Sequence, residues 1–332
     1  MQPSLFQINN KTFLVIYIPK FKKDLQNSGS TIFIGIDKVG IIGVDKKVEI
    51  VQKNKRYSFY PKISALISLP PNQRGIHMSR SSETIEEVIN ESVYKPASTI
   101  EIVSDRIARK LFKEHPYTTK IEVKLEGRII IQLKENNHRV IQKSYDVSSI
   151  VYGNRNELGE QEFDYFIGAK AMGMSCCPCA IDLSKEYAES VMKNREDINI
   201  SNEDIKTLLN ILPFSSHNQR SLGSITVQIK DINKQQIDVL DLIDVIEESM
   251  SGKIQSVLKR PEEAQLVRTA HLNPLFAEDI VRGMAKNFYA KGFPDLGEGK
   301  IIFQVESFES IHPYNVYCEL KMNYSELVKM MK

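Results

Sequence analysis

Three of the four cysteines lie within four positions, Cys176, Cys177 and Cys179, in the stretch GMSCCPCA. Thiolates are preferred ligands of zinc and iron. The single residue between Cys177 and Cys179 makes a gap shorter than the two-residue gap of zinc ribbons. We therefore expect one of these sulfurs to bind a metal and the other to serve a different role. The alternative is a group of small buried residues near a strand end.

Two later segments offer further metal ligands. His217 lies in SHNQRS after a proline-led turn, and Glu262 and Glu263 follow Pro261 in LKRPEE. Each has an ordinary alternative, since His217 fits a surface histidine and the glutamates fit the first turn of a helix, where negative charge is favoured. Together with the cysteines they indicate a site with mixed thiolate, imidazole and carboxylate ligands.

Two more segments carry groups that can bind a substrate or move protons. Glu309 and His312 end an apolar strand in ESFESIH, and a carboxylate beside an imidazole can transfer protons near neutral pH. Glu278 lies in the first turn of an amphipathic helix in NPLFAEDIVR, where a simple capping charge is the alternative. Basic residues near these segments are Lys170, Arg220, Lys259 and Arg260. Together they could form a phosphate-binding rim, although each alone fits a solvated surface charge.

The elements that position these residues alternate between strands and helices in both halves of the chain. In the first half, strands are expected at 13–18, 31–36, 39–45 and 47–52, helices from 81 and over 98–115, and a strand pair turning at Glu126-Gly127. In the second half, strands are expected at 221–231, 300–310 and 316–322, with helices at 239–250 and 274–292, the latter ending at Gly292. This order predicts an α+β fold with two related halves, residues 1–155 and 156–332.

Composition excludes several functional classes. The 332 residues contain 44 Lys and Arg against 42 Asp and Glu, which argues against a protein dominated by a nucleic-acid-binding surface. No apolar run reaches the roughly 20 residues that span a bilayer, so we expect no membrane partner and a cytoplasmic location. There is no P-loop or dinucleotide fingerprint. Four cysteines do not make a disulfide framework.

The motifs GMSCCPCA, SHNQRS, LKRPEE, NPLFAEDIVR and ESFESIH, in this order, with RGIHMSR at 74–80, resemble the GTP cyclohydrolases of the type IB and archaeal group. The resemblance covers roughly residues 70 to 320. It implies a tunnelling fold with two tandem ββααββ-like units, and a homo-oligomer, dimer or tetramer, with active sites at interfaces. It also implies GTP as the substrate and one divalent metal per subunit, with Fe(II) expected first and Zn(II) or Mn(II) as alternatives.

The resemblance also implies a role for each motif residue. Cys177, His217 and Glu263 match the metal ligands, with Glu262 an open alternative to Glu263, and Cys179 matches a catalytic thiol. Glu278 matches the carboxylate that binds guanine, while Glu309 and His312 match a proton-transfer pair. His77 belongs to the first-half motif and is expected to be catalytic.

The spacing of the motifs distinguishes two products. Cys177 and His217 are 40 residues apart, and this long, helix-like insert, with AMGM before the cysteines, resembles the archaeal branch. That branch makes 7,8-dihydroneopterin 2′,3′-cyclic phosphate, releasing formate and pyrophosphate, for tetrahydromethanopterin-type pterins. The alternatives are a type IB enzyme that stops at dihydroneopterin triphosphate, a non-catalytic purine- or pterin-binding protein of the same fold, and a zinc-stapled structural protein.

Overall fold

The computed structural model describes residues 4–332 except 9–10, 16–23, 53–54, 95–96, 136–138, 196, 198 and 236. Its strands are β1 (Ser4–Ile8), β2 (Lys11–Val15), β3 (Ile36–Asp45), β4 (Val48–Gln52), β5 (Lys55–Leu69), β6 (Lys120–Glu135), β7 (Arg139–Arg155), β8 (Gln161–Cys176), β9 (Asn218–Ile229), β10 (Gly252–Lys253), β11 (Lys300–Ser307) and β12 (Val316–Asn323). Its helices are α1 (Met78–Tyr94), α2 (Ile100–Glu114), α3 (Pro178–Asn194), α4 (Asn202–Ile211), α5 (Val239–Glu248), α6 (Arg260–Leu272), α7 (Ala277–Ala290) and α8 (Tyr324–Met331).

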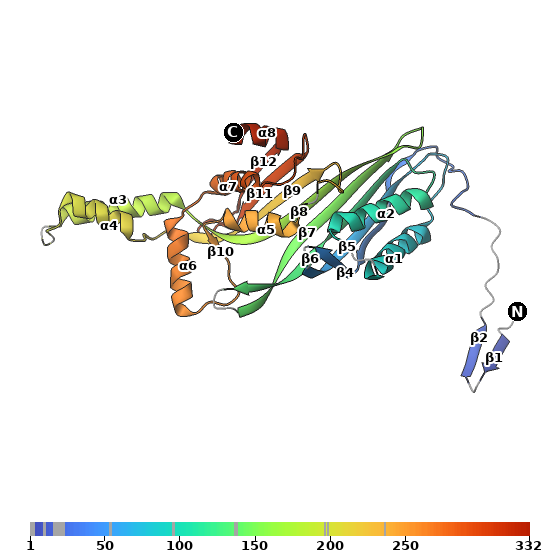
Figure 1. The fold of residues 1–332 in the computed structure, drawn as a ribbon, viewed down its shortest axis with the longest axis horizontal. Helices are drawn as coiled ribbons and strands as arrows, with labels where there is room; N and C mark the ends of the chain where they lie inside the picture. Colours follow the sequence, from blue (N-terminus) through green and yellow to red (C-terminus); the bar gives the residue numbers. More distant parts are fainter. Residues whose placement is uncertain are drawn as a thin grey trace.

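Ten of the strands form one antiparallel sheet, and eight of them follow the order β12-β11-β9-β8-β7-β6-β5-β3 (Figure 1). The short strand β4 pairs with β5, β10 pairs with β8, and β1 and β2 form a separate hairpin. The predicted α+β fold class is therefore confirmed, with its strands in an antiparallel sheet. Among the described residues no helix is long and apolar enough to cross a membrane.

The order of elements repeats along the sheet. In the first half α1 and α2 lie in the chain between β5 and β6, and in the second half α5, α6 and α7 lie between β9 and β11. The strand β7 ends at Arg155 and β8 begins at Gln161, with the two strands paired to each other. The sheet thus runs without interruption across the predicted division at 155, and the two-unit organisation stays a prediction.

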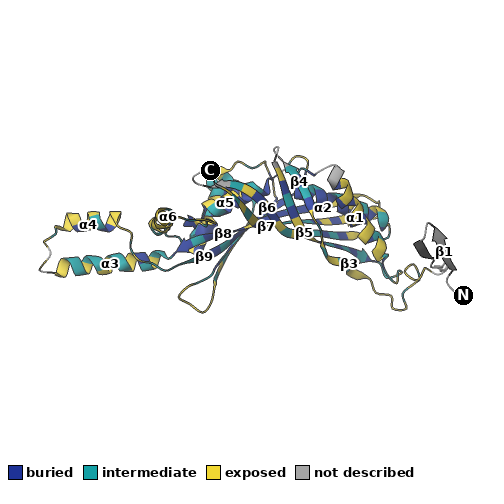
Figure 2. Ribbon diagram, turned by 90° about the horizontal axis from the view of Figure 1, so that it is seen from below, coloured by how far each residue is buried: buried dark blue, intermediate teal, exposed yellow. Residues whose placement is uncertain are grey.

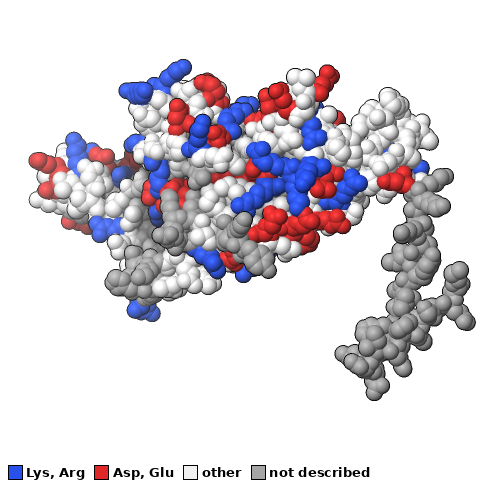
Figure 3. Space-filling model, turned by 45° about the vertical axis from the view of Figure 1, so that its right-hand side comes forward, with Lys and Arg blue, Asp and Glu red and all other residues white. Residues whose placement is uncertain are grey.

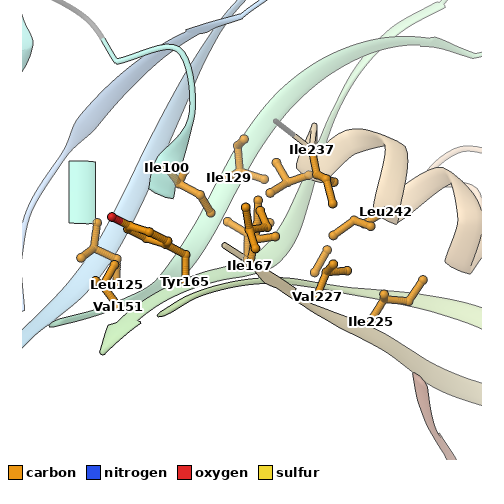
Figure 4. Packing of buried hydrophobic residues seen from close by; sticks show 14 of the residues in the cluster. Ile100, Leu125, Ile129, Val151, Tyr165, Ile167, Ile225, Val227, Ile237 and Leu242 are labelled. Carbon is orange, nitrogen blue, oxygen red and sulfur yellow. The ribbon is translucent and has the colours of Figure 1, made fainter. Parts of the chain in front are cut away.

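The core lies between the sheet and its helices. Helix α2 packs on β6 and β7, α5 on β8 and β9, and α7 on β11 and β12. Because side chains alternate across a strand, one face of β6 supplies Ile121, Val123, Leu125 and Ile129 to the core. Figure 4 shows Leu125 and Ile129 among the buried apolar residues that join the two halves. This continuous core fixes the strand ends that carry the site.

The expectation of a turn at Glu126-Gly127 was wrong, because β6 runs straight through both residues. Gly127 lies opposite Pro61 of β5, and a Cβ at Gly127 would be 2.0 Å from the carbonyl oxygen of Tyr60. A glycine inside a strand often marks such a close backbone approach. The glycine therefore serves strand packing and not a hairpin.

The other expected elements have mixed outcomes. The helices predicted from 81, over 98–115, and over 239–250 and 274–292 are confirmed as α1, α2, α5 and α7. Gly292 follows α7 with a φ of 68°, the left-handed conformation that ends many helices. In 31–36 only Ile36 belongs to a strand, and of the expected strand at 13–18 residues 16–18 lie outside the described residues.

The long insert between β8 and β9 forms a helical hairpin, as expected for this segment. Helices α3 and α4 pack on each other and project from the body of the molecule (Figures 1 and 2). The hairpin buries Ile181, Ile205 and Leu209, whereas Leu183 and Tyr187 are exposed. The base of this hairpin, where the chain leaves and rejoins the sheet, carries Cys177 and His217.

Candidate active site

Strand pairing brings Cys177 and His217 together despite the long insert between them. The ladder between β8 and β9 extends to the pair Cys176 and Asn218. One residue further, the Cys177 amide donates to the His217 carbonyl over 3.2 Å, and the Ser216 hydroxyl donates to the Cys177 carbonyl over 2.8 Å. Pro178 then begins α3, a favoured position for proline. The hairpin is thus closed at its base by the two predicted ligands.

The segment before α7 places Glu278 beside the same strand end. The Leu275 amide donates to the Cys176 carbonyl over 3.0 Å, which joins this segment to the end of β8. Phe276 caps α7, and Glu278 is its second residue. A carboxylate in the first turn is favoured by the helix dipole, and Glu278 is exposed beside the end of β8.

The chain leaving β11 supplies the remaining groups. The Phe308 amide donates to the Arg220 carbonyl of β9 over 2.9 Å, which continues the β11–β9 pairing beyond the strand. Glu309 follows directly. The ring of His312 stacks on that of Tyr314, with the ring centres 5.1 Å apart and the planes at 8°. This stacking gives the imidazole a defined orientation.

These three segments surround one cavity of about 270 Å³. Five predicted site residues line it: Cys177, His217, Glu278, Glu309 and His312. Its other lining residues include Ser175, Gln219, Phe276, Ser307 and Tyr314. The structure therefore gathers a thiol, two imidazoles and two carboxylates in one place.

A hydrogen-bond network joins His217 to Glu309 through a residue that sequence reasoning missed. Gln219 Oε1 lies 3.0 Å from His217 Nδ1, and Gln219 Nε2 donates to Glu309 Oε1 over 3.0 Å. Below Gln219, the buried hydroxyls of Ser175, Ser221 and Ser307 bond to one another at 2.8 to 3.2 Å. The signal in the sequence was the alternation of positions 217, 219 and 221 at the start of β9, since residues two apart in an extended chain lie on the same side.

Glu309 has Gln219 and His217 as neighbours, whereas His312 was the expected partner. Glu309 accepts from Gln219 and lies 3.9 Å from His217 Nδ1, whereas His312 contacts Tyr314. Both Glu309 and His312 line the cavity, so their role as a proton-transfer pair stays a prediction.

The three clustered thiols have different surroundings. Cys176 is fully buried, and burial, with the charge of Cys177, raises its thiol pKa to about 11. Cys177 lines the cavity, whereas Cys179 is exposed in the first turn of α3 and does not line it. Of the three, Cys177 is the thiol best placed to bind a metal, and the catalytic role of Cys179 stays a prediction.

Glu263 lies on α6 and lines a neighbouring cavity of about 600 Å³ with Phe214, Arg260 and His271. Within the described residues no three His, Cys, Asp or Glu side chains converge as a metal site. The thiolate and imidazole of the first cavity fit zinc or iron in their chemistry. Glu263 and Glu262 do not line the cavity of Cys177 and His217, so the assignment of either as the third ligand stays a prediction.

The predicted phosphate-binding residues and His77 do not line the 270 Å³ cavity. Lys170 lines a separate cavity on the sheet with Arg128 and Tyr145, and Arg260 lies in that of Glu263. Arg220 is exposed and Lys259 caps α6. His77 lies before α1 in the first half, with Nε2 3.2 Å from Asn27. On the face shown in Figure 3, a cluster of Lys and Arg adjoins Asp and Glu, so that this face is not uniformly basic.

Solved structures with a related arrangement include two uricases. The crystal structure of uricase from Arthrobacter globiformis matches with a TM-score of 0.46 and 8% identity, covering 89% of this chain and 96% of that one. The uricase from Bacillus fastidious matches with a TM-score of 0.48 and 9% identity, covering 89% and 96%. Likeness at this level carries no functional conclusion.

The curated proteins with similar sequences have much higher identity to this chain than the solved structures do. The GTP cyclohydrolase MptA of Methanocaldococcus jannaschii is 33% identical over 92% of this chain and 96% of its own length. The GTP cyclohydrolase MptA of Methanococcus vannielii is 35% identical over 92% and 97%. The family model described as type I GTP cyclohydrolase folE2 matches residues 23–318, a range that includes every residue lining the cavity. The chain therefore belongs to the type I GTP cyclohydrolase folE2 family.

Proposed function

We propose that this chain is a GTP cyclohydrolase that makes 7,8-dihydroneopterin 2′,3′-cyclic phosphate, formate and pyrophosphate, in the first step of a tetrahydromethanopterin-type pterin pathway. The observation that carries the proposal is the single cavity that gathers Cys177, His217, Glu278, Glu309 and His312. Family membership and the relatives named GTP cyclohydrolase MptA support the same activity.

The proposed metal is one divalent ion, with Fe(II) first and Zn(II) or Mn(II) as alternatives. Cys177 and His217 would hold it, and Glu263 is the proposed third ligand. Such an ion would supply hydrolytic power by lowering the pKa of a water molecule. The insert is relevant because its closed base holds the two ligands just beyond the ends of adjacent strands, where the backbone hydrogen bond between Cys177 and His217 limits their separation.

Glu278 would select guanine. Its carboxylate can accept hydrogen bonds from two neighbouring N–H groups of the base, which adenine does not present in that arrangement. A base lacking those donors would leave the carboxylate unpaired, and an unpaired charged acceptor is costly. The apolar ring of Phe276, which also lines the cavity, offers a surface against which the base can pack.

His312 would donate a proton to the ring nitrogen as the C8–N9 bond of guanine breaks. Its stacking on Tyr314 limits rotation of the imidazole, which favours a fixed direction of proton transfer. Glu309, which accepts a hydrogen bond from Gln219, would provide negative charge that stabilises the imidazolium form of His312.

The triphosphate needs a site outside the cavity. Ligand pockets are usually about 300–1,000 Å³, so about 270 Å³ is enough for the base but not for a whole nucleotide. Lys170, Arg220, Lys259 and Arg260 do not line this cavity. We propose a tunnelling fold whose subunits, as a dimer or tetramer, meet at the active site, so that a neighbouring copy supplies His77 and basic residues.

Two features support such an interface. The outer edges of β3 and β12 have no strand partner among the described residues, and unpaired edges favour pairing with another chain. Phe276, Ile311 and Tyr314 are exposed around the cavity. Mixing the inactive variants His77→Ala and His217→Ala should restore some activity if the two residues act in one site from different copies. Complete inactivity of the mixture, with exchange of subunits verified, would refute a shared site.

Anaerobic incubation with GTP and Fe(II), followed by mass analysis of the pterin, tests the proposed reaction. The expected product is the cyclic phosphate with one pyrophosphate per GTP, a prediction supported by the α3–α4 insert, whose length resembles the archaeal branch. Accumulation of dihydroneopterin triphosphate would instead identify the type IB reaction. Unchanged GTP in the presence of bound metal would favour a non-catalytic binding protein.

A further inference from the structure

Gln219 is placed between the proposed metal ligand His217 and the carboxylate of Glu309. Its side-chain oxygen lies 3.0 Å from His217 Nδ1, and its side-chain nitrogen lies 3.0 Å from Glu309 Oε1. A third contact joins the same nitrogen to Ser307 Oγ at 3.4 Å. All of these groups are largely shielded from solvent, with side-chain exposures of 15% for His217 and 9% for Glu309.

When Glu309 is ionised, the hydrogen bonds among His217, Gln219 and Glu309 allow only one assignment of donors and acceptors. A carboxylate only accepts hydrogen bonds, so the amide NH₂ of Gln219 must face Glu309. The amide oxygen then faces His217 and accepts, which requires the proton of the neutral imidazole to be on Nδ1. Glu309 Oε2, 3.9 Å from the same nitrogen, also favours an N–H over a lone pair there.

The serine cluster holds Gln219 in this orientation from the other side. Ser175, Ser221 and Ser307 come from three adjacent strands, and each is at most 2% exposed. Their mutual hydrogen bonds fix Ser307 Oγ beside the Gln219 amide nitrogen. A rigid sheet therefore supports the amide, and the amide in turn supports the imidazole.

We infer that Gln219 is a positioning residue that fixes the tautomer of His217, with the proton on Nδ1 and the lone pair on Nε2. Histidines that bind metals usually donate their other ring N–H to a nearby oxygen, which orients the ring and selects the tautomer. The functional consequence rests on the proposed metal site, because only the nitrogen with a lone pair can bind an ion. The tautomer itself can be measured without any metal.

Nitrogen-15 NMR of histidine-labelled, metal-free protein at pH 8 tests the inference. The two ring nitrogens of a neutral histidine give well-separated signals, and comparison with the variant His217→Gln assigns those of His217. In the wild type we expect a protonated Nδ1 and an unprotonated Nε2. In Gln219→Leu, which removes the acceptor and the donor together, this preference should be lost.

Two further variants separate positioning from general structure. Gln219→Glu keeps an acceptor beside Nδ1, and with one proton shared between its carboxyl group and that of Glu309 it should retain the wild-type tautomer. Gln228→Leu removes another largely buried glutamine of β9, which bonds to Asp164 over 2.9 Å outside the site, and it should leave the His217 signals unchanged. An unchanged tautomer in Gln219→Leu, with native circular dichroism, would overturn the inference.

Metal affinity provides the second measurement. Loss of such a supporting hydrogen bond typically weakens metal binding about 10- to 100-fold, and we expect this loss for Gln219→Leu in competition with a chelator and Zn(II) as the probe. A wild type that binds no metal but has the expected tautomer would refute the proposed metal site while supporting the role of Gln219. Equal affinity of wild type and Gln219→Leu would refute the role of Gln219 in metal binding.

Discussion

Replacing Glu101 with glutamine should stabilise the protein at alkaline pH and not at acid pH. Glu101 is the second residue of α2 and is fully buried, and neither of its carboxyl oxygens has a hydrogen-bond partner of good geometry among the described residues. Burial raises its pKa from 4.5 to about 7, against a smaller opposing effect of the nearby Thr99 hydroxyl and of its own backbone. At 1.36 kcal/mol per pH unit this difference corresponds to about 3 kcal/mol.

The direction follows from linkage. A carboxyl whose pKa is higher in the folded state favours folding below the unfolded pKa of 4.5, and this contribution is lost as pH rises through about 7. The neutral side chain in Glu101→Gln does not titrate. Its stability relative to the wild type should therefore increase by about 3 kcal/mol between pH 4.5 and pH 8. The buried amide of the new glutamine, if it lacks a hydrogen-bond partner, lowers the free energy of unfolding by about 1–3 kcal/mol. This loss is the same at pH 4.5 and pH 8.

Urea unfolding of both proteins at fixed protein concentration, at pH 4.5, 6 and 8, measures the free-energy difference from the midpoint and slope. The exposed residue Glu83 of α1 gives a matched control, and Glu83→Gln should show little pH-dependent difference from the wild type. A Glu101→Gln difference that stays constant across this pH range would refute the buried, unpaired state of Glu101.

Three further predictions concern the site and its supporting sheet. Cys177→Ala and His217→Ala should each lose bound metal and activity with unchanged circular dichroism, and full metal occupancy measured by elemental analysis would remove that residue from the ligand set. Glu278→Gln should raise the KM for GTP about 10- to 100-fold, since a hydrogen bond to a charged group contributes about 1.5–3 kcal/mol; an unchanged KM would leave Glu278 only a helix-start charge. Gly223→Ala should destabilise the protein by about 1–3 kcal/mol, because the new Cβ would be 2.5 Å from Ile246 Cγ2. Gly283→Ala, whose nearest atom is 3.5 Å away, is its control in thermal unfolding, and equal melting temperatures would contradict the packing argument.

Residue types and motifs select the candidate site residues, but they do not show which of these residues the fold brings together. Five of the residues singled out by type and motif line one cavity, because chemical groups are visible in a sequence without knowledge of the fold. Cys177 and His217 are 40 residues apart in the sequence, and their closeness in space cannot be predicted from residue types because it depends on the pairing of β8 with β9. Gln219 was missed because its importance comes from its two neighbours and not from its residue type.

Contacts between distant segments determine the positions of Gly127 and Glu263, and these contacts cannot be predicted from local sequence patterns. Gly127 reads as a turn when its neighbours in sequence are considered, but its role comes from the close approach of Tyr60 in another strand. Glu263 lies near the other motif residues in the order of the chain, whereas α6 places it in a neighbouring cavity, and its role as a ligand stays a prediction.

Release of formate from GTP labelled at C8 tests the central claim most directly, that the cavity lined by Cys177 and His217 opens the guanine ring. The wild-type protein with Fe(II) under anaerobic conditions should release one labelled formate per GTP consumed. His217→Ala, matched by the Gln228→Leu control on the same strand, should release none while the control remains active. Labelled formate released equally by wild type and His217→Ala would contradict the account, as would its absence from a metal-loaded wild type.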